Sequence, residues 1–549
     1  MSNAFVDKYS PLHPAAIRGE SSVATFGTAA FATPEEIRRS LSPRAGRDAT
    51  PVLGYYVDEA SGSDKLCPIH PPPGNVLINA SSGAGKTSGP IETAALTHSG
   101  PSIFIDGKGQ AYHHTAGARQ KYMGRNAVLL TTDGPTQVFN PLLTVRIDHS
   151  NPKGGRYEAR DCMAIAHISA HGYTGDNRFF ENASVKAVGG VIGHVLTAEL
   201  ASDSGSFKDD PEVTLPRERS PAEVSRLLTL DHNGRRLLAQ RMQKSGRHFI
   251  RQAGSMLADA SIGDGKLAMN IAMFGSENWS IFESHEVRAM TYKAASPGPK
   301  SEPAPNDVDF TTFRDGRDDV YVVFPLMETA RYAPVLRMFV GTMLDVLSRD
   351  SGSAESPFVT MHIDEFPQLK TLDPVQDWIM FLRGARISPW FYVQDSASLR
   401  RHYPDSWATF EANATKVFFG INDICTAEHL SKYLGMATVS NRTYSLTGGQ
   451  GGGKSYTWQT SSGVYGTDSK GETTSENWFG SSTETVAYTG RPLKTPDEIL
   501  RMGRHEMIIL VRGMKPIQAY LIPYYDFPEL KRMSETPPPH VLPFSKFLD

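Results

Sequence analysis

The sequence is poor in cysteine, lacks a long apolar run and has no excess of basic residues. Its three cysteines, Cys67, Cys162 and Cys425, lie far apart without metal-ligand spacing, so we expect reduced thiols in a cytoplasmic compartment. No window approaches the roughly 20 apolar residues that cross a bilayer, and the N-terminus lacks a signal-peptide pattern. The formal net charge of −3 gives no global basic field, so any DNA contact must come from local patches. These absences predict a soluble chain.

What the sequence does contain is an α/β pattern, in a chain of 549 residues that is too long for one ordinary core. Short apolar runs recur at helical distances, which is typical of buried parallel strands. Between about 150 and 295 this alternation stops, and the pattern predicts helices at 159–170, 181–200 and 234–256. Strand-like runs then return, which favours one α/β domain interrupted by a helical insertion. The predicted strands are 75–79, 102–106, 127–130, 319–324, 358–363, 390–393 and 416–419.

The first of these strands leads into a glycine-rich segment, Ala-Ser-Ser-Gly-Ala-Gly-Lys-Thr, at 80–87. A phosphate loop needs this order of strand, glycine turn and helix start, because backbone N–H groups and the helix dipole then converge on anionic oxygens. Lys86 would place its charge at the β- and γ-phosphates of ATP, and the Thr87 hydroxyl would ligate Mg²⁺. Ala80 stands where the strict motif has its first glycine. The predicted nucleotide-binding residues are Ser82, Gly83, Ala84, Gly85, Lys86, Thr87 and Ser88.

The strict letter pattern of a phosphate loop occurs elsewhere, at 448–455. No apolar strand enters that glycine run, and the residues after it cannot form an amphipathic helix. Because a motif of this kind depends on its structural context, we interpret the run as part of a mobile Gly/Ser/Thr-rich loop at 447–482 and not as the nucleotide site.

An acidic pair follows a later strand and supplies the second half of an ATPase site. Asp364 and Glu365 come directly after the apolar run 358–363, at the strand edge where open parallel sheets bind ligands. We assign Asp364 to Mg²⁺ and Glu365 to polarising the attacking water. Gln394 ends the next strand, so its amide is a candidate sensor of the γ-phosphate; a polar strand end is an equal alternative. His362 is expected to pack in its strand, and His113 and His114 are expected at the surface.

These residues together resemble a family, the type IV secretion coupling proteins, TraG-like ring ATPases that feed DNA or protein into conjugation-type channels. The resemblance spans roughly residues 25–530 and rests on the order and spacing of the motifs more than on any one of them. In chain order the motifs lie at 26–32, 80–87, 105–109, 139–142, 364–369, 383–396, 419–423 and 491–499.

The resemblance implies a P-loop NTPase fold with a mainly parallel twisted sheet, the RecA-like core of ring motors, interrupted by an all-helical insertion. The domains would be an N-terminal arm at 1–55, the two parts of the nucleotide-binding domain at 56–148 and 313–549, and a substrate-recruiting insertion at 149–312. Typical members begin with transmembrane helices. Here only 25 residues precede the first motif, so we expect a naturally soluble member or one whose anchor has been removed.

The resemblance also implies partners. We expect a homo-oligomer, a hexameric ring at work and a monomer in isolation. The ring would take single-stranded DNA or a relaxase–DNA complex to components of a type IV secretion channel. Effector proteins are a further expected cargo. The protein's place would be cytoplasmic, peripheral at the inner-membrane face. Arg383, expected on the helix between the strand that precedes Asp364 and the strand that Gln394 ends, is the candidate for an arginine that acts on a neighbouring subunit's ATP. Arg386 is its rival.

Six basic residues within the insertion form a run without an acidic residue. They could recruit single-stranded DNA through its phosphates, or they could form a solvated helix face, and the second interpretation has at least equal weight. The six residues are Arg235, Arg236, Arg241, Lys244, Arg247 and Arg251.

Three functions therefore compete. The leading hypothesis is a coupling ATPase for a type IV secretion channel. A ring DNA translocase for chromosome or plasmid handling would use the same motor core. A docking platform gated by nucleotide would recruit partners and pump nothing.

Overall fold

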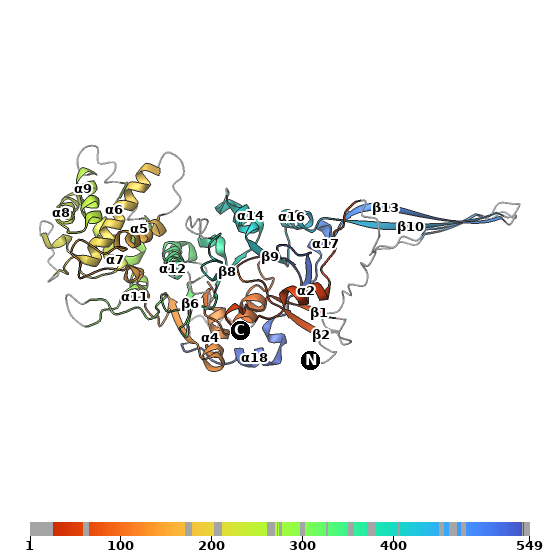
Figure 1. Cartoon of the computed structure of the whole chain (residues 1–549), viewed down its shortest axis with the longest axis horizontal. Coiled ribbons are helices and arrows are strands. Elements are labelled where there is room, and N and C mark those ends of the chain that lie inside the picture. The colour runs from red at the N-terminus through yellow and green to blue at the C-terminus, as the bar shows by residue number, and fades with distance from the viewer. Residues whose placement is uncertain are drawn as a thin grey trace.

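The computed structural model shows an elongated molecule in which a helical segment, a central sheet and a long β-ribbon follow one another (Figure 1). It describes residues 26–44, 46–58, 65–170, 178–201, 211–260, 270–271, 273, 277–296, 302–325, 328–349, 356–369, 379–404, 406–449, 455–459, 469–473, 479–540 and 542.

The centre of the molecule is one sheet of 11 strands in the order β2-β1-β15-β14-β9-β3-β8-β7-β4-β6-β5. The seven strands from β9 to β5 run parallel, and β14, β15, β1 and β2 extend the β9 edge with antiparallel pairs. The strands are β1 Gly54–Asp58, β2 Lys65–Ile69, β3 Asn75–Ala80, β4 Ser102–Ile105, β5 Asn126–Thr131, β6 Asp318–Val323, β7 Val359–Ile363, β8 Ile387–Val393, β9 Ala414–Phe419, β14 Glu506–Leu510 and β15 Ile517–Tyr520.

The predicted parallel strands are confirmed, and their burial explains why their sequences are apolar on both faces. Every residue of β3, β4, β7 and β8 is buried. One apolar cluster packs β3 against helices α2 Pro34–Leu41, α3 Glu92–Thr97 and α4 Gln110–Met123. The opposite face meets α12 Thr329–Arg349, α14 Ser396–His402, α15 Trp407–Ala412 and α16 Ile424–Leu434. The result is an α/β sandwich of three layers.

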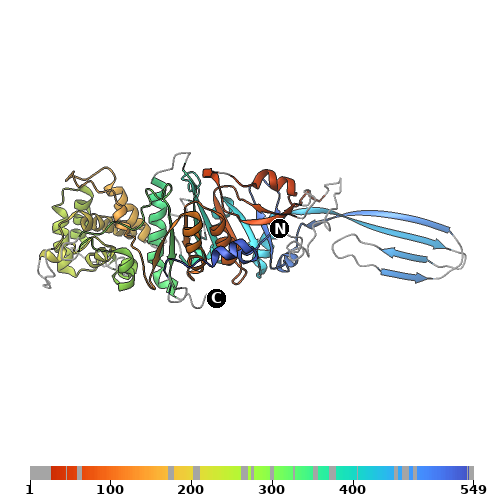
Figure 2. The same ribbon diagram turned by 90° about the horizontal axis from the view of Figure 1, so that it is seen from below.

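The helical segment lies between β5 and β6, within the range in which an insertion is predicted, and forms one end of the molecule (Figure 2). Its apolar core continues through α12 into the core of the sheet. The segment contains α5 Glu158–Ser169, α6 Arg178–Thr197, α7 Pro221–Leu228, α8 His232–Gln243, α9 His248–Ala260 and α11 His285–Thr291.

The single helix predicted at 234–256 is wrong, because the structure has two helices there, α8 and α9, that pack side by side. The chain turns between them at Gly246. A Cβ atom at this position would lie 2.2 Å from the carbonyl oxygen of Pro152, so the close approach of this turn to the segment at Pro152 requires glycine.

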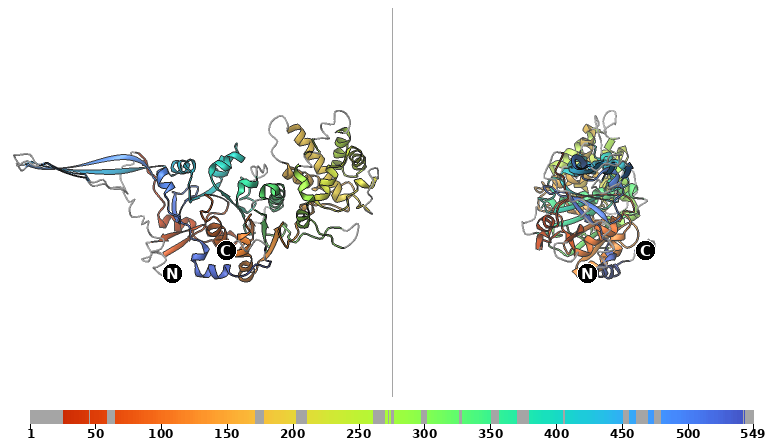
Figure 3. Two further views of the ribbon diagram at one scale, coloured as in Figure 1. Left: turned by 180° about the vertical axis from the view of Figure 1, so that it is seen from behind. Right: turned by 90° about the vertical axis from the view of Figure 1, so that its right-hand side faces the viewer.

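At the other end of the molecule, β10 Met436–Gly449 pairs with β13 Phe479–Pro492 in a long antiparallel ribbon (Figure 3). A second pair, β11 Ser455–Gln459 and β12 Ser469–Thr473, lies within the same stretch of sequence. The described residues of 447–482 are therefore all strand residues rather than the predicted loop. Ribbon pairing satisfies backbone groups without an apolar face, which is why no hydrophobic pattern predicts it. Residues 450–454 of the glycine run lie outside the described residues.

A bridge between Thr28 and Ala437 ties the base of the ribbon to the first motif of the chain. Further short elements complete the fold around the sheet. They are the π-helix η4 Thr87–Ile91, the 3₁₀ helices η2 Gly46–Asp48, η5 Pro141–Thr144, η7 Pro211–Thr214, η8 Ser280–Glu283, η10 Phe366–Leu369 and η11 Tyr524–Asp526, and helices α17 Pro496–Leu500 and α18 Pro528–Ser534.

Candidate nucleotide site

The glycine-rich segment connects β3 to η4 and forms a loop around the side chain of Lys86. Gly83 and Gly85 have φ angles of 76° and 92°, in the left-handed region that favours glycine. The Lys86 ammonium is almost fully buried and donates to the carbonyl oxygens of Ala80 and Ser81 at 2.8 and 3.3 Å. Burial lowers its pKa, and the nearby Glu365 and Asp364 carboxylates oppose that change. The charge is thus held inside the loop where an anion would bind.

The first turn after the loop is a π-helix that starts at Thr87 and leads into α3. The amide groups of a first helical turn have no partners within the helix, so they are available to an anion, and the helix dipole adds to the attraction. Pro90 lies inside this turn, where its missing N–H costs no intrahelical hydrogen bond.

The segment after β9 braces the loop from the side. The Ser81 hydroxyl donates to Asn422 Oδ1 at 2.6 Å. Gly420 has a φ of 54°, and a Cβ atom placed on it would lie 2.5 Å from the Cβ of Ala84. This close approach fixes the position of the loop relative to the sheet.

Three carboxylates gather at the carboxyl ends of β4 and β7, opposite Lys86. Asp364 is held in place by the backbone N–H of Glu365, which donates to it at 3.0 Å, and Glu365 Oε1 lies 3.9 Å from Lys86 Nζ. Burial raises the pKa of Asp364 to about 7, with the charges of Asp106 and Glu365 adding to the rise and that of Lys86 opposing it. Burial also raises the pKa of Asp106, although the backbone N–H groups of Lys108 and Ala111 donate to it.

Glu365 occupies an unusual backbone position. Its φ of 50° is rare for a residue with a side chain, and such strain is common at functional sites. The Gln394 amide nitrogen lies 3.0 Å from both of its carboxylate oxygens. The structure therefore brings together Lys86, Asp364, Glu365 and Gln394, all of which the sequence nominates.

A bound divalent cation would offset the repulsion among the close carboxylates of Asp106, Asp364 and Glu365. Mg²⁺ takes one or two protein carboxylates and completes its shell with water and phosphate oxygens. Thr87, the first residue of η4, and Asp364, the residue after β7, line the same cavity and fit that role. Nowhere in the described part of the chain, this site included, are three or more His, Cys, Asp or Glu side chains arranged to hold a metal by themselves.

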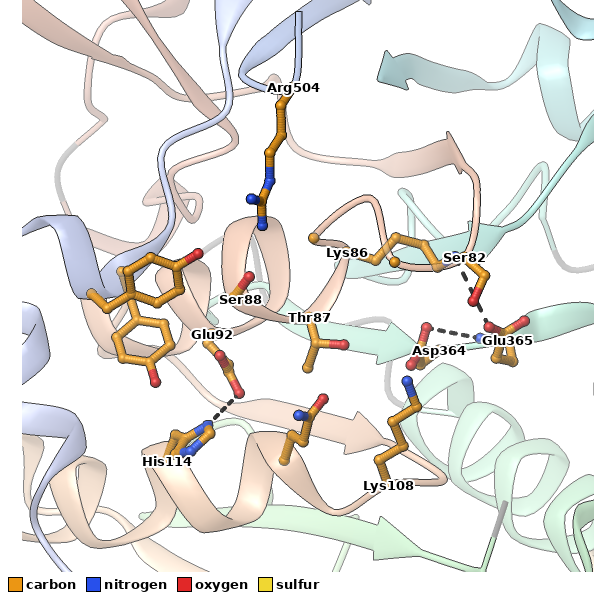
Figure 4. A pocket seen from close by; sticks show the side chains of 15 residues that line it. Ser82, Lys86, Thr87, Ser88, Glu92, Lys108, His114, Asp364, Glu365 and Arg504 are labelled. Atoms are coloured by element: carbon orange, nitrogen blue, oxygen red, sulfur yellow. Dashed lines mark hydrogen bonds and ion pairs between the residues drawn. The ribbon is translucent and has the colours of Figure 1, made fainter. Parts of the chain in front are cut away.

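Lys86, Thr87, Asp364 and Glu365 line one cavity of about 490 Å³, a size suited to a nucleotide (Figure 4). The sequence did not predict several of the residues that line this cavity. Arg504 enters from the segment before β14, and Tyr524 and Tyr525 come from the segment after β15. Lys108 belongs to the motif at 105–109 and enters from the loop after β4. His114, expected at the surface, faces the cavity instead and hydrogen-bonds through Nδ1 to the buried Glu92 carboxylate at 2.7 Å. Only the helical spacing of Gln110 and His114 on α4 could have indicated a shared face.

The histidine of the acidic strand behaves as predicted. His362 is buried, its Nδ1 is 2.9 Å from the hydroxyl of Tyr392, and burial lowers its pKa to about 3. It packs in the sheet as a neutral ring.

The two candidate arginines lie at the opposite end of β8 from Gln394. Arg383 is exposed in a turn at 379–386 rather than on the predicted helix. Because β8 has seven residues, at about 3.3 Å each, Arg383 lies roughly 20 Å from this chain's own Glu365. Arg386 is ion-paired with Asp48 at 2.8 Å, and its guanidinium lies 4.2 Å from the centre of the Phe358 ring.

Much of the predicted basic patch in the insertion is directed at the protein itself. Arg247 is ion-paired at 2.7 Å with Glu158, whose side chain is buried, and Arg251 donates to the carbonyl oxygens of Ser245 and Gly246. Arg235 donates to Leu230 and Arg241 to Thr214. Arg236 and Lys244 are the exposed members.

The sheet order, the loop around Lys86 and the acidic pair define a P-loop nucleotide-binding protein. A family model described as "Type IV secretory system Conjugative DNA transfer" matches residues 60–226 and 296–542, which is more than half of the sequence. The chain belongs to this family, and the resemblance drawn from its motifs is confirmed.

Curated relatives and solved structures agree with this assignment. Conjugal transfer protein TraG of Escherichia coli is 24% identical over 562 residues, covering 94% of this chain and 79% of TraG. Protein VirD4 of Agrobacterium fabrum is 22% identical over 471 residues, covering 84% of this chain and 60% of VirD4. The conjugative coupling protein TrwBdeltaN70 has a TM-score of 0.57 at 12% identity, covering 90% of this chain and 94% of that chain. TrwB in complex with the ATP analogue ADPNP has the same TM-score at 13% identity, covering 92% and 96%. These structures share the fold.

No helix in the described ranges has both the length and the apolar character that crossing a membrane requires.

Proposed function

We propose that this chain is the ATP-hydrolysing coupling protein of a type IV secretion channel, which recruits DNA or protein substrates and drives them into the channel. The observation that carries the proposal is the group formed by Lys86, Asp364, Glu365 and Gln394 at the carboxyl edge of the sheet. Two further facts support it: the chain belongs to the conjugative DNA transfer family, and structures of TrwB hold ADPNP or ADP with Mg²⁺.

Each protein group has a distinct task in this proposal. Lys86 would exchange the carbonyl oxygens of Ala80 and Ser81 for phosphate oxygens. Thr87 and Asp364 would hold Mg²⁺, which would neutralise the charge that develops on the phosphates. Glu365 accepts a hydrogen bond from the attacking water and polarises it. In the structure this carboxylate is held by the Gln394 amide, so movement of Gln394 toward a terminal phosphate would release it.

The decisive measurement is ATP turnover with and without single-stranded DNA. Lys86→Ala should abolish nucleotide binding, whereas Glu365→Gln should retain binding and lower kcat by roughly 10²- to 10⁴-fold. Glu428→Gln, an exposed carboxylate on α16, is a matched control that should change neither. Absence of turnover in the wild-type protein, together with unimpaired transfer by Lys86→Ala, would leave only a docking platform. Processive stripping of a third strand from double-stranded DNA would favour a chromosome-type translocase.

We further propose a ring, a hexamer in its working state, in which Arg383 serves the neighbouring subunit. Arg383 is too far from its own chain's site to act there, and the contacts of Arg386 with Asp48 and Phe358 make Arg386 the weaker candidate. Mixing Arg383→Ala subunits with Lys86→Ala subunits should restore some active interfaces. Failure to recover turnover at every mixing ratio would exclude the trans role.

The substrate surface and the location are also part of the proposal. We expect the exposed Arg236 and Lys244 to contact phosphates of single-stranded DNA, alone or bound to a relaxase, while effector proteins are alternative cargo. Neutralising both residues should lower the slope of log affinity against log salt by at most about 1.4, since each phosphate contact on a single strand contributes about 0.7. An unchanged slope would make them a solvated face. We place the protein at the cytoplasmic side of the inner membrane, next to the channel components.

A further inference from the structure

The nucleotide cavity has two chemically different ends. Lys86 and Lys108 lie at the end that contains Glu365, and the buried Glu92 carboxylate lies at the other end, beside His114 (Figure 4). Anionic phosphates favour the lysine end, and the carboxylate of Glu92 disfavours them at its own end. An uncharged part of a ligand therefore belongs beside Glu92.

The C-terminal part of the chain forms the wall at this second end. Arg504 lies near Ser88 and apart from Glu365 and Lys108 (Figure 4). Tyr524 and Tyr525 also line the cavity, and the ring centre of Tyr524 lies 5.7 Å from that of His114. The guanidinium of Arg504 has no hydrogen bond or ion pair to another described residue, and its side chain is exposed.

The two tyrosines differ in burial, and this difference suits one of them to a ligand. Tyr524 is 8% exposed and packs with Leu96 of α3 and Ala118 of α4. Tyr525 is 43% exposed, and its ring centre lies 5.5 Å from that of Tyr524 at an interplanar angle of 74°. The buried ring thus supports the exposed ring edge-on and leaves a large aromatic surface at the cavity wall.

The direction of a bound triphosphate connects these features. The phosphate that is cleaved must lie next to Glu365, so the remainder of the molecule passes Thr87 and Ser88 toward the opposite end. There it meets an exposed aromatic ring and an unpaired guanidinium, both of which stack on flat heterocycles.

We propose that this end of the cavity is the nucleoside subsite, in which Tyr525 stacks on the base and Arg504 flanks it. The inference rests on the proposed function, because it assumes that the phosphates of a nucleoside triphosphate occupy the loop around Lys86. It adds a base-binding role for residues of the C-terminal segment that lie more than 400 positions from the phosphate loop.

The test compares two probes that share phosphates but differ in the nucleoside: the β,γ-imido analogue of ATP and inorganic tripolyphosphate, each with Mg²⁺, measured by calorimetry. Tyr525→Ala should weaken binding of the ATP analogue about 5- to 150-fold, the range for loss of one stacked base, and leave tripolyphosphate binding within twofold. Tyr525→Phe should bind both probes like the wild type, since the ring is retained.

Tyr122→Ala is the matched control, because Tyr122 is 49% exposed on α4 and does not line the cavity. It should change neither affinity. If Tyr525→Ala weakens both probes equally, or neither, the subsite is wrong while the proposed function stands. If the wild-type protein binds neither probe, the proposed function fails and the subsite fails with it.

Discussion

Replacing Asp161 with asparagine should destabilise the junction between the helical segment and the sheet. Asp161 lies on α5 with its side chain 1% exposed, and Arg146 contacts it through Nε and a terminal nitrogen at 2.8 Å each. Arg349, the last residue of α12, approaches at 3.5 Å. Removing one partner of a fully buried ion pair costs about 3–5 kcal/mol. The Arg146 side chain is 39% exposed, and Arg349 keeps Asp345 and the carbonyl oxygen of Thr144, so we expect a smaller loss of about 2 kcal/mol.

The assay is urea unfolding at pH 7, followed as a shift in midpoint at constant slope. The pH dependence provides a second test. Burial acts to raise the pKa of Asp161, but the hydrogen bonds of Arg146 and the charge of Arg349 outweigh it, and the pKa is lowered. A carboxylate with a lowered pKa stabilises the fold above the ordinary range near 4, and this contribution is lost as pH falls through the lowered pKa. The difference between wild type and Asp161→Asn should therefore disappear in acid.

A matched control uses an exposed ion pair of similar geometry. Asp497 contacts Arg501 at 3.0 Å, with the two side chains 64% and 74% exposed. Asp497→Asn should cost no more than about 0.5 kcal/mol, because solvent screens such pairs. If Asp161→Asn costs less than about 1 kcal/mol, or no more than the control, the reasoning from burial is refuted.

Two further predictions concern the phosphate loop and the strand that feeds it. Gly420→Ala should weaken nucleotide binding at least tenfold in a fluorescence titration, because the new Cβ would collide with Ala84. The control is Gly513→Ala, where the φ is also positive, at 81°, but no atom lies within 4 Å, so binding should not change. Equal effects of the two substitutions would assign the loss to backbone strain alone. Asn79→Leu should raise the free energy of unfolding by about 1 kcal/mol. The Asn79 side chain is 1% exposed, and neither the oxygen nor the nitrogen of its amide has a hydrogen-bond partner among the described residues. A lower urea midpoint for the variant would show that the amide is hydrogen-bonded in the wild-type protein.

The sequence predicts the local parts of the site well because their signal is local. A buried strand, a glycine turn and a helix start are contiguous in the chain, so the loop around Lys86 can be predicted without knowledge of the fold. The same holds for Asp364 and Glu365 after their apolar strand. The glycine run at 448–455 shows the value of context, because its described residues belong to β10 of the ribbon and to β11 of the second strand pair.

Predictions fail where a residue's surroundings come from distant segments. His114 looks like a surface residue in its helix, and only the approach of α3 places Glu92 against it. Arg247 looks like part of a DNA-binding run, and only the approach of the turn between α8 and α9 to the first residue of α5 gives it Glu158. The periodicity of apolar residues specifies which face of a helix is apolar. It does not specify which charged residue lies on the element that packs beside the helix.

The sequence by itself determined the class of this protein: an α/β fold, a phosphate loop, an acidic pair and membership of a conjugative transfer family. Only the tertiary structure decided which distant residues complete the site. Glu365 meets Gln394 because β7 and β8 are neighbours, and Tyr525 and Arg504 reach the cavity because β14 and β15 extend the sheet beyond β9. Strand order depends on packing between elements far apart in the chain, and a local pattern of apolar residues is compatible with many such orders.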